Sequence, residues 1–201
     1  MIIDMHVHLS KELPYEKWAS KKWPNTRPFH HKAGVFLKKM SITEPKIDRA
    51  LIFGFRAMCS EKPEIMIEDN DYIAETVSRY PERFIGSGII DPSWDGKAID
   101  ELARVRKLGF KVVKIKFASV HMPANCPLSQ KIFTHIDDMG MLAVLHSDWS
   151  HWTNPSIIAD LARRFPDTKI VLQHFGLSQS SEAIEVLKNN TNMYVDTSAL
   201  I

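Results

Sequence analysis

The sequence predicts an α/β fold in which seven strands, the first six each followed by a helix, form a parallel sheet of the (β/α)8 TIM-barrel type. Strands and helices alternate along the whole chain, and most strands are nearly continuous apolar runs, as expected of strands buried on both faces. Histidines also fall in the carboxyl-terminal halves of the first, fifth and sixth strands, and only a barrel brings those ends to one mouth. An open doubly wound sheet shares the first two features. With seven units, we expect an incomplete barrel that lacks strand eight.

The first predicted strand, residues 2–8, has a polar face and an apolar face. Its period of two places Asp4, His6 and His8 on one side and apolar side chains on the other. The other predicted strands cover residues 49–55, 84–90, 111–117, 141–146, 169–174 and 193–197. Helices are predicted over residues 32–41, 68–80, 97–108, 129–139, 156–165 and 181–189. Asp69 or Asn70 is expected to cap the second of these helices.

Length and composition limit the class of protein. A chain of 201 residues with 44% hydrophobic residues fits one domain, residues 1–201, which we expect to be truncated at its C-terminus. Lysine and arginine number 26 against 24 aspartates and glutamates, a balance that favours neither nucleic acid nor a membrane surface as partner. Cys59 and Cys126 are far apart and are expected to be free thiols, and no leader or membrane span is recognised. We expect a cytoplasmic protein with a small-molecule substrate, and a homo-oligomer is left open.

The spacing of His6 and His8 points to a metal ion. Two residues apart on a strand, their Cα atoms lie about 6.5–7 Å apart and both imidazoles leave the same face, so they can converge on one ion. The alternative is an edge strand whose polar face carries two histidines by chance. Asp4 shares the face and is expected to orient the ligands rather than to bind the metal directly.

Several segments together resemble a known family. They are the first strand from Asp4 to His8, residues 80–84 before a glycine-rich third strand that ends in Asp-Pro, the Leu-His pair at 145–146 and the Gln-His-Phe-Gly segment at 173–176. This combination is similar to the amidohydrolase superfamily, and within it to the amidohydrolase-related group that includes 2-amino-3-carboxymuconate-6-semialdehyde decarboxylase. The resemblance implies that His6, His8 and His146 are metal ligands and that His174 positions or deprotonates a metal-bound water. The family completes its site with an aspartate after strand eight, which this sequence lacks.

Three further residues are candidates with an alternative each. Lys116 ends the fourth strand, where part of the superfamily carries a carboxylated lysine between two metals; an ion-paired lysine is the other interpretation. Asp196 could replace the missing acid, or it is a buried or capping carboxylate. Arg56 could clamp a substrate carboxylate, or it is a surface arginine. The lysine- and tryptophan-bearing connection over residues 10–31 is expected to form a partial lid.

The predicted function is that of a metal-dependent hydrolase. A divalent ion with imidazole ligands lowers the pKa of bound water from 15.7 to about 7. We expect the ion to be zinc, with one ion in the site and a second left open. The resulting hydroxide would attack an amide, ester or lactone. The alternative is non-oxidative decarboxylation of a small aromatic or unsaturated carboxylic acid, because the same scaffold and ligands serve both reactions. An inactive truncated fragment or binding scaffold is the third interpretation.

Overall fold

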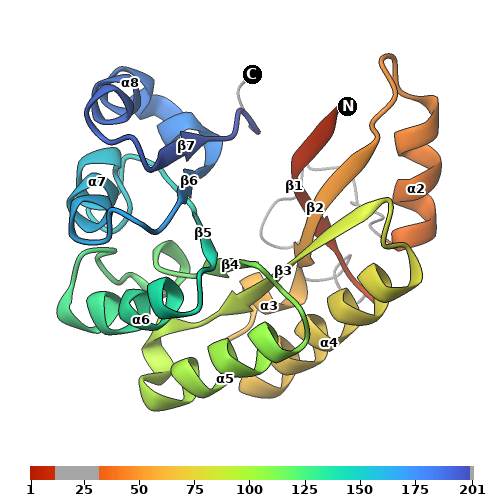
Figure 1. Ribbon diagram of the computed structural model, residues 1–201, viewed down its shortest axis with the longest axis horizontal. Helices are drawn as coiled ribbons and strands as arrows, with labels where there is room; N and C mark the ends of the chain where they lie inside the picture. The colour runs from red at the N-terminus through yellow and green to blue at the C-terminus, as the bar shows by residue number, and fades with distance from the viewer. Residues whose placement is uncertain (12–31, 200–201) are drawn as a thin grey trace. The chain divides into compact units, whose positions relative to one another are not determined.

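The structure, a computed structural model, describes residues 1–11 and 32–199 (Figure 1). Seven strands pair in parallel in the order of the sequence, β1 to β7, and helices separate them along the chain. The predicted α/β fold with seven parallel strands is therefore confirmed. The chain divides into two compact units, residues 1–86 and 87–201, with the boundary inside strand β3.

The first unit contains two whole strands and the start of a third. β1 (Ile3–Leu9) pairs with β2 (Arg49–Gly54), which pairs with the first residues of β3 (Phe84–Ile90). The register aligns His8 with Phe53 and shifts once between Asp4 and Val7. The helices of this unit are α2 (Ala33–Ile42), α3 (Arg56–Cys59) and α4 (Pro63–Arg79).

Helix α4 begins five residues before the predicted start. Pro63 occupies its first position, where the fixed φ of proline suits a helix and its missing N–H would have no partner. The prediction that Asp69 or Asn70 caps this helix is therefore wrong, because both lie inside it and are buried. The Asp69 carboxylate instead accepts a hydrogen bond from the backbone N–H of Ala57, at 2.8 Å. Gly54 allows this approach, since a Cβ there would stand 2.6 Å from the Cβ of Asp69.

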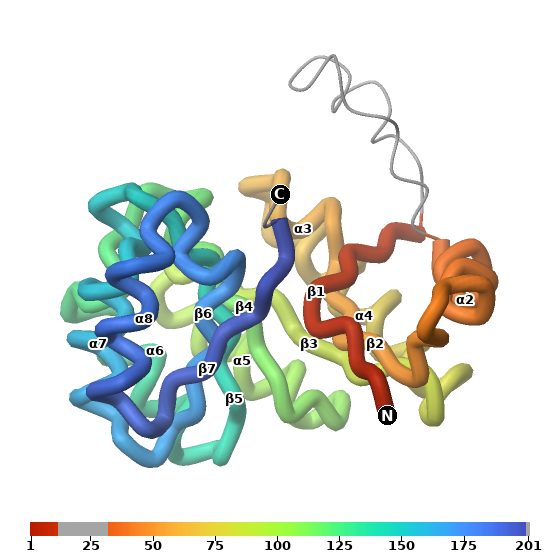
Figure 2. Tube along the Cα trace, turned by 90° about the horizontal axis from the view of Figure 1, so that it is seen from above, coloured from red at the N-terminus to blue at the C-terminus, as the bar shows by residue number. Residues whose placement is uncertain are grey.

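The second unit continues β3 and adds four strands, each shorter than predicted. These are β4 (Val112–Ile115), β5 (Leu142–Leu145), β6 (Ile170–Leu172) and β7 (Met193–Val195). The α-helices of the unit are α5 (Gly96–Lys107), α6 (Pro127–Asp138), α7 (Pro155–Arg164) and α8 (Ser180–Asn189). Short 3₁₀ segments follow three strands: η1 (Pro92–Trp94), η2 (Ala118–Val120) and η3 (Gln173–Gln179). Helices α6, α7 and α8 lie on the same side of β5, β6 and β7 (Figures 1 and 2).

The register of the second unit brings its strand ends level with one another. Ile115 of β4 pairs with Ile90 and with Leu145, and Leu145 pairs with Leu172. The residues that follow these positions therefore leave the sheet together at its carboxyl edge, where parallel α/β proteins place their functional side chains. They include both histidines that the sequence assigned to the fifth and sixth strands.

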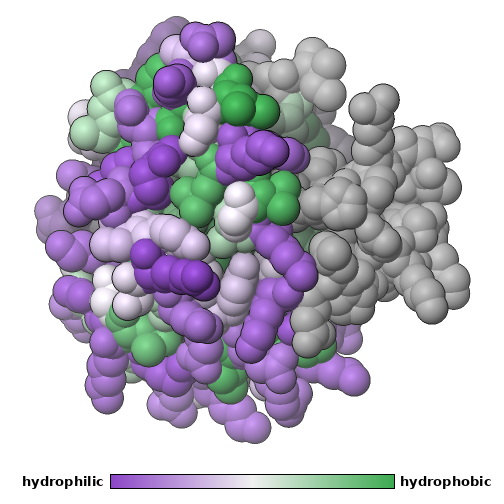
Figure 3. All heavy atoms as spheres, turned by 90° about the vertical axis from the view of Figure 1, so that its right-hand side faces the viewer, coloured by the Kyte–Doolittle hydropathy of each residue, from purple (hydrophilic) through white to green (hydrophobic). Residues whose placement is uncertain are grey.

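The surface near α2 carries mainly polar side chains. Figure 3 shows hydrophilic atoms over most of the coloured part of this face, with hydrophobic atoms in small separate groups. Val35 and Ile42 are the large hydrophobic residues of α2 that stay exposed. Among the residues that the structure describes, no helix combines the length and apolar character needed to cross a membrane.

Candidate active site

In the first unit, strand β1 holds the two histidines close together. The Nε2 atoms of His6 and His8 lie 3.2 Å apart. Both rings pack edge-on against the ring of Phe53, with centroid distances of 5.1 Å for His6 and 4.4 Å for His8, and this packing restricts their orientation. Two nitrogens that each lie about 2.1 Å from one ion, at an N–metal–N angle near the tetrahedral value, stand about 3.4 Å apart. At 3.2 Å the two rings can share a hydrogen bond when no ion is present, and the same spacing is compatible with two ligands of one metal ion.

Two other candidates of this unit make local contacts. The Asp4 carboxylate accepts a hydrogen bond from the backbone N–H of His6, at 3.0 Å, so it holds the polar segment of β1 in place. Arg56 is the first residue of α3 and forms an ion pair with Glu68, its Nη1 lying 3.2 Å from Oε2. The arginine is thus held at the carboxyl end of β2 by a neighbour on α4.

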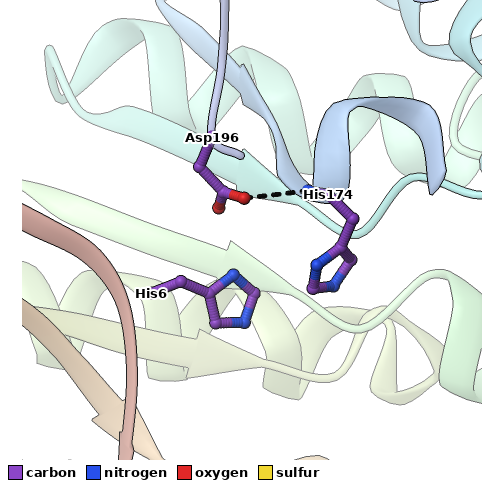
Figure 4. A group of neighbouring side chains, drawn as sticks. All are labelled: His6, His174 and Asp196. Carbon is purple, nitrogen blue, oxygen red and sulfur yellow. Dashed lines mark hydrogen bonds between the residues drawn. The ribbon is translucent and has the colours of Figure 1, made fainter. Parts of the chain in front are cut away.

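In the second unit, His146 and His174 meet at the ends of β5 and β6. Their ring centroids are 4.8 Å apart in an edge-to-face arrangement. His174 was predicted to end its strand, but β6 stops at Leu172 and His174 has a left-handed backbone conformation, with φ of 60°, inside η3. This rare conformation is held by the hydrogen bond from the His174 backbone N–H to Asp196, at 2.9 Å (Figure 4).

Asp196 follows β7 directly and is buried. Its Oδ1 also accepts hydrogen bonds from the backbone N–H of Ser198, at 3.1 Å, and from the Ser198 hydroxyl, at 2.6 Å. The same hydroxyl lies 2.9 Å from Nδ1 of His174. A short polar chain therefore runs from Asp196 through Ser198 to the imidazole of His174.

Two buried lysines lie on β4 and at its end. Lys116 forms an ion pair with Asp91, with 3.2 Å between Nζ and Oδ2, and both side chains are almost fully buried. The other oxygen of Asp91 accepts hydrogen bonds from the backbone N–H and the hydroxyl of Ser93. Burial lowers the pKa of Lys114 from 10.5 to about 7, against the opposing effect of the negative charge of Asp196. The interior at this end of the sheet therefore holds one buried ion pair, Lys116 with Asp91, and a second buried lysine whose charged form burial disfavours.

Sequence reasoning missed Asp148, the acidic neighbour of His146. Its Oδ2 lies 3.2 Å from Nε2 of His146. Burial tends to raise the pKa of Asp148, but hydrogen bonds from His146 and Ser150 outweigh burial and hold the pKa well below its usual range. Asp91 and Ser198 were also not assigned to the site. The only signal in the sequence was position: Asp148 stands two residues after a strand-end histidine.

The structure thus brings together the candidates within each unit. His6, His8 and Asp4 gather on β1, and His146, His174 and Asp196 gather at the ends of β5, β6 and β7. That His6, His8 and His146 bind one ion stays a prediction. From residue 12 onward, the predicted lid lies outside the described residues.

Known proteins are similar to this chain in sequence and in fold. The family model described as Amidohydrolase matches residues 3–201. A TIM-barrel protein from Bordetella bronchiseptica has a similar fold, with a TM-score of 0.79 and 16% identity over 98% of this chain and 74% of its own. A dihydroxybenzoic acid decarboxylase from Polaromonas, solved with manganese and the inhibitor 2-nitroresorcinol, matches with a TM-score of 0.68 and 18% identity over 99% and 79%.

A hydrolase is among the matches as well. A probable 2-pyrone-4,6-dicarboxylic acid hydrolase from Acinetobacter baumannii, solved with citric acid, matches with a TM-score of 0.64 and 16% identity, over 98% of this chain and 70% of its own. Several other matching structures are decarboxylases of 2,6-dihydroxybenzoate or 5-carboxyvanillate. At such identities the likeness establishes the TIM-barrel type of fold and leaves the reaction to be argued from the residues.

Proposed function

Since this chain belongs to the amidohydrolase family, we propose that it is a metal-dependent enzyme that removes carbon dioxide from a small aromatic or unsaturated carboxylic acid. The observation that carries the proposal is the 3.2 Å spacing between the Nε2 atoms of His6 and His8, which fits two ligands of one ion. The decarboxylases among the structures of similar fold favour this reaction over hydrolysis.

The metal would be held by His6 and His8, with His146 as the third ligand. Imidazole accepts zinc, iron, nickel or cobalt, and manganese is less favoured but compatible, so the donor set fits a divalent ion without selecting one. Zinc is the ion we expected, whereas manganese is the ion found in the Polaromonas decarboxylase of similar fold. When bound, such an ion acts as a Lewis acid toward a substrate oxygen and lowers the pKa of a bound water.

The residues of the chain have separate tasks in the proposed reaction. Arg56 offers a guanidinium that can pair with a substrate carboxylate in two parallel hydrogen bonds. Decarboxylation breaks the bond between the ring carbon and the carboxylate, and the electron pair left on that carbon must accept a proton. His174 is the proposed carrier of this proton, because imidazole titrates near neutral pH and Ser198 and Asp196 fix the orientation of its ring.

Hydrolysis of a lactone, ester or amide is the second candidate. It is favoured by one observation, the similarity of fold to the probable 2-pyrone-4,6-dicarboxylic acid hydrolase. The same histidines would serve, with His174 taking a proton from water instead of delivering one to carbon. The two reactions differ in their product, since only decarboxylation releases carbon dioxide.

A product assay on metal-loaded protein tests the proposal. The purified chain would be stripped with a chelator, reloaded with Mn²⁺ or Zn²⁺, and incubated with 2,6-dihydroxybenzoate, 5-carboxyvanillate and 2-pyrone-4,6-dicarboxylate. We expect carbon dioxide from at least one carboxylated phenol, dependent on metal and lost in His6→Ala and His8→Ala. His135→Ala is the matched control, because His135 lies on α6. Acid release from the pyrone without carbon dioxide would favour hydrolysis, and turnover by the stripped His6→Ala variant would contradict the metal site.

A further inference from the structure

A carboxylate that the sequence reasoning passed over is built against the third proposed metal ligand. His146 follows the last residue of β5, and Oδ2 of Asp148 lies 3.2 Å from its Nε2. The two side chains are partly buried, with 30% and 16% of their surfaces exposed. Because both belong to the second unit and to one short stretch of chain, their geometry depends on no other element of the proposed site.

The position of Asp148 is fixed by the turn that follows it. Its Oδ1 accepts hydrogen bonds from the backbone N–H of Ser150, at 2.9 Å, and from the hydroxyl of Thr153, at 3.1 Å. Its own backbone N–H donates to the carbonyl of Thr153, at 3.3 Å. One oxygen thus anchors the carboxylate and the other is directed at the imidazole. The two hydrogen bonds at Oδ1 therefore fix the orientation of the Asp148 carboxylate toward His146.

The contact also determines which nitrogen of His146 carries the proton. An ionised carboxylate only accepts hydrogen bonds, so the nitrogen that faces it must be the N–H. If Nε2 is protonated in the neutral ring, Nδ1 carries the lone pair. Histidine ligands of metals commonly donate their other N–H to a carboxylate in this manner, which sets the tautomer and the rotation of the ring.

We propose that Asp148 is a positioning residue that fixes the Nε2–H tautomer of His146, so that Nδ1 is the nitrogen offered to the metal. The inference rests on the proposed function for the identity of the ligand set, and it adds the residue that orients the third ligand and the atom through which that ligand binds. The acidic partner acts through His146 and does not itself touch substrate.

The test combines two measurements on the full chain. In the metal-free protein at about pH 8, ¹⁵N spectra of the histidine rings report the tautomer, with the His146 signal assigned by its loss in His146→Gln. Competition with a chromophoric chelator then gives the dissociation constant for Zn²⁺. Asp148→Asn keeps the size of the side chain and one anchoring oxygen but places an N–H where Oδ2 accepted. Thr153→Val removes one anchoring hydroxyl and keeps the carboxylate, so it serves as the matched control for damage to the turn.

We expect the Nε2–H tautomer in the wild type, a shift toward Nδ1–H in Asp148→Asn, and a loss of Zn²⁺ affinity of about 10- to 100-fold in that variant. Thr153→Val should keep the tautomer and lose less affinity. An Nδ1–H tautomer in the wild type, or a tautomer unchanged in Asp148→Asn, would overturn the inference while leaving the proposed function intact. If the wild type binds no Zn²⁺ or Mn²⁺ at all, the proposed function fails, and the metal role of Asp148 fails with it.

Discussion

The buried carboxyl of Asp69 should make the stability of the chain depend on pH in an unusual direction. Burial raises its pKa from 3.8 to about 6, and the hydrogen bond from the Ala57 backbone N–H only partly opposes this effect. In the unfolded chain the pKa returns to its ordinary value. Between the two values the folded protein therefore binds more protons than the unfolded chain, so the free energy of unfolding falls as pH rises through this window.

The size of the effect follows from the two pKa values. A change from 3.8 to about 6 corresponds to a full difference of about 3 kcal/mol, at about 1.36 kcal/mol for each unit of pKa. Between about pH 4.5 and 7.5 the part contributed by Asp69 is about 2 kcal/mol, because the unfolded carboxyl is already mostly ionised at the lower pH. The side chain is 1% exposed, so solvent screening reduces this figure little.

Asp69→Asn is the variant that isolates the effect. The amide keeps an oxygen for the Ala57 N–H and cannot ionise, but it adds a donor where Oδ1 has no hydrogen-bond partner in the described part of the chain. Its absolute stability therefore combines two changes, and the difference between the two pH values is the quantity to compare. Urea unfolding should show that this difference is smaller by about 2 kcal/mol in the variant. Equal pH dependence in both proteins would refute the reasoning.

Three other outcomes are expected. Lys116→Met should lower the free energy of unfolding, measured in urea, by about 3–5 kcal/mol, because it leaves the buried Asp91 carboxylate uncompensated. The double variant with Asp91→Asn should recover part of this loss, and no recovery would contradict a direct pair. Gly54→Ala should lower the free energy of unfolding by about 1–3 kcal/mol, since the new Cβ would lie 2.6 Å from a buried side chain. Gly96→Ala is the control, because nothing lies within 4 Å of its new Cβ, and it should lower the free energy of unfolding by less than about 0.5 kcal/mol. Similar losses in the two variants would show that the close contact at Gly54 relaxes freely. A metal ion at a free concentration of 100 times its dissociation constant should raise the free energy of unfolding by about 2.7 kcal/mol, measured by thermal unfolding. A chelator should abolish this stabilisation, and a variant that lacks both β1 histidines should not show it.

The prediction of fold succeeded because it depended on periodicity, which is local. Buried parallel strands appear as apolar runs and helices as 3.6-residue patterns, so a parallel sheet of seven strands could be predicted from local patterns, whereas the choice of a barrel over an open sheet depended on the histidines at three strand ends. Element ends were less accurate, since they depend on caps and neighbours. Helix α4 begins at Pro63, earlier than predicted, so Asp69 lies buried inside the helix and does not cap it. Strand β6 ends before His174, because the backbone of His174 is left-handed.

In the candidate site, too, some features follow from the local sequence and others only from tertiary contacts. The sequence by itself determined that His6 and His8 share a face, because alternation along a strand is a property of the backbone. It also placed His146 and His174 at strand ends. Only the tertiary structure decided that Asp148 turns back on His146 and that Asp91 pairs with Lys116, a contact between residues 25 positions apart. Such partners depend on register and on turn geometry, which bring side chains together in ways that no local pattern of residues encodes.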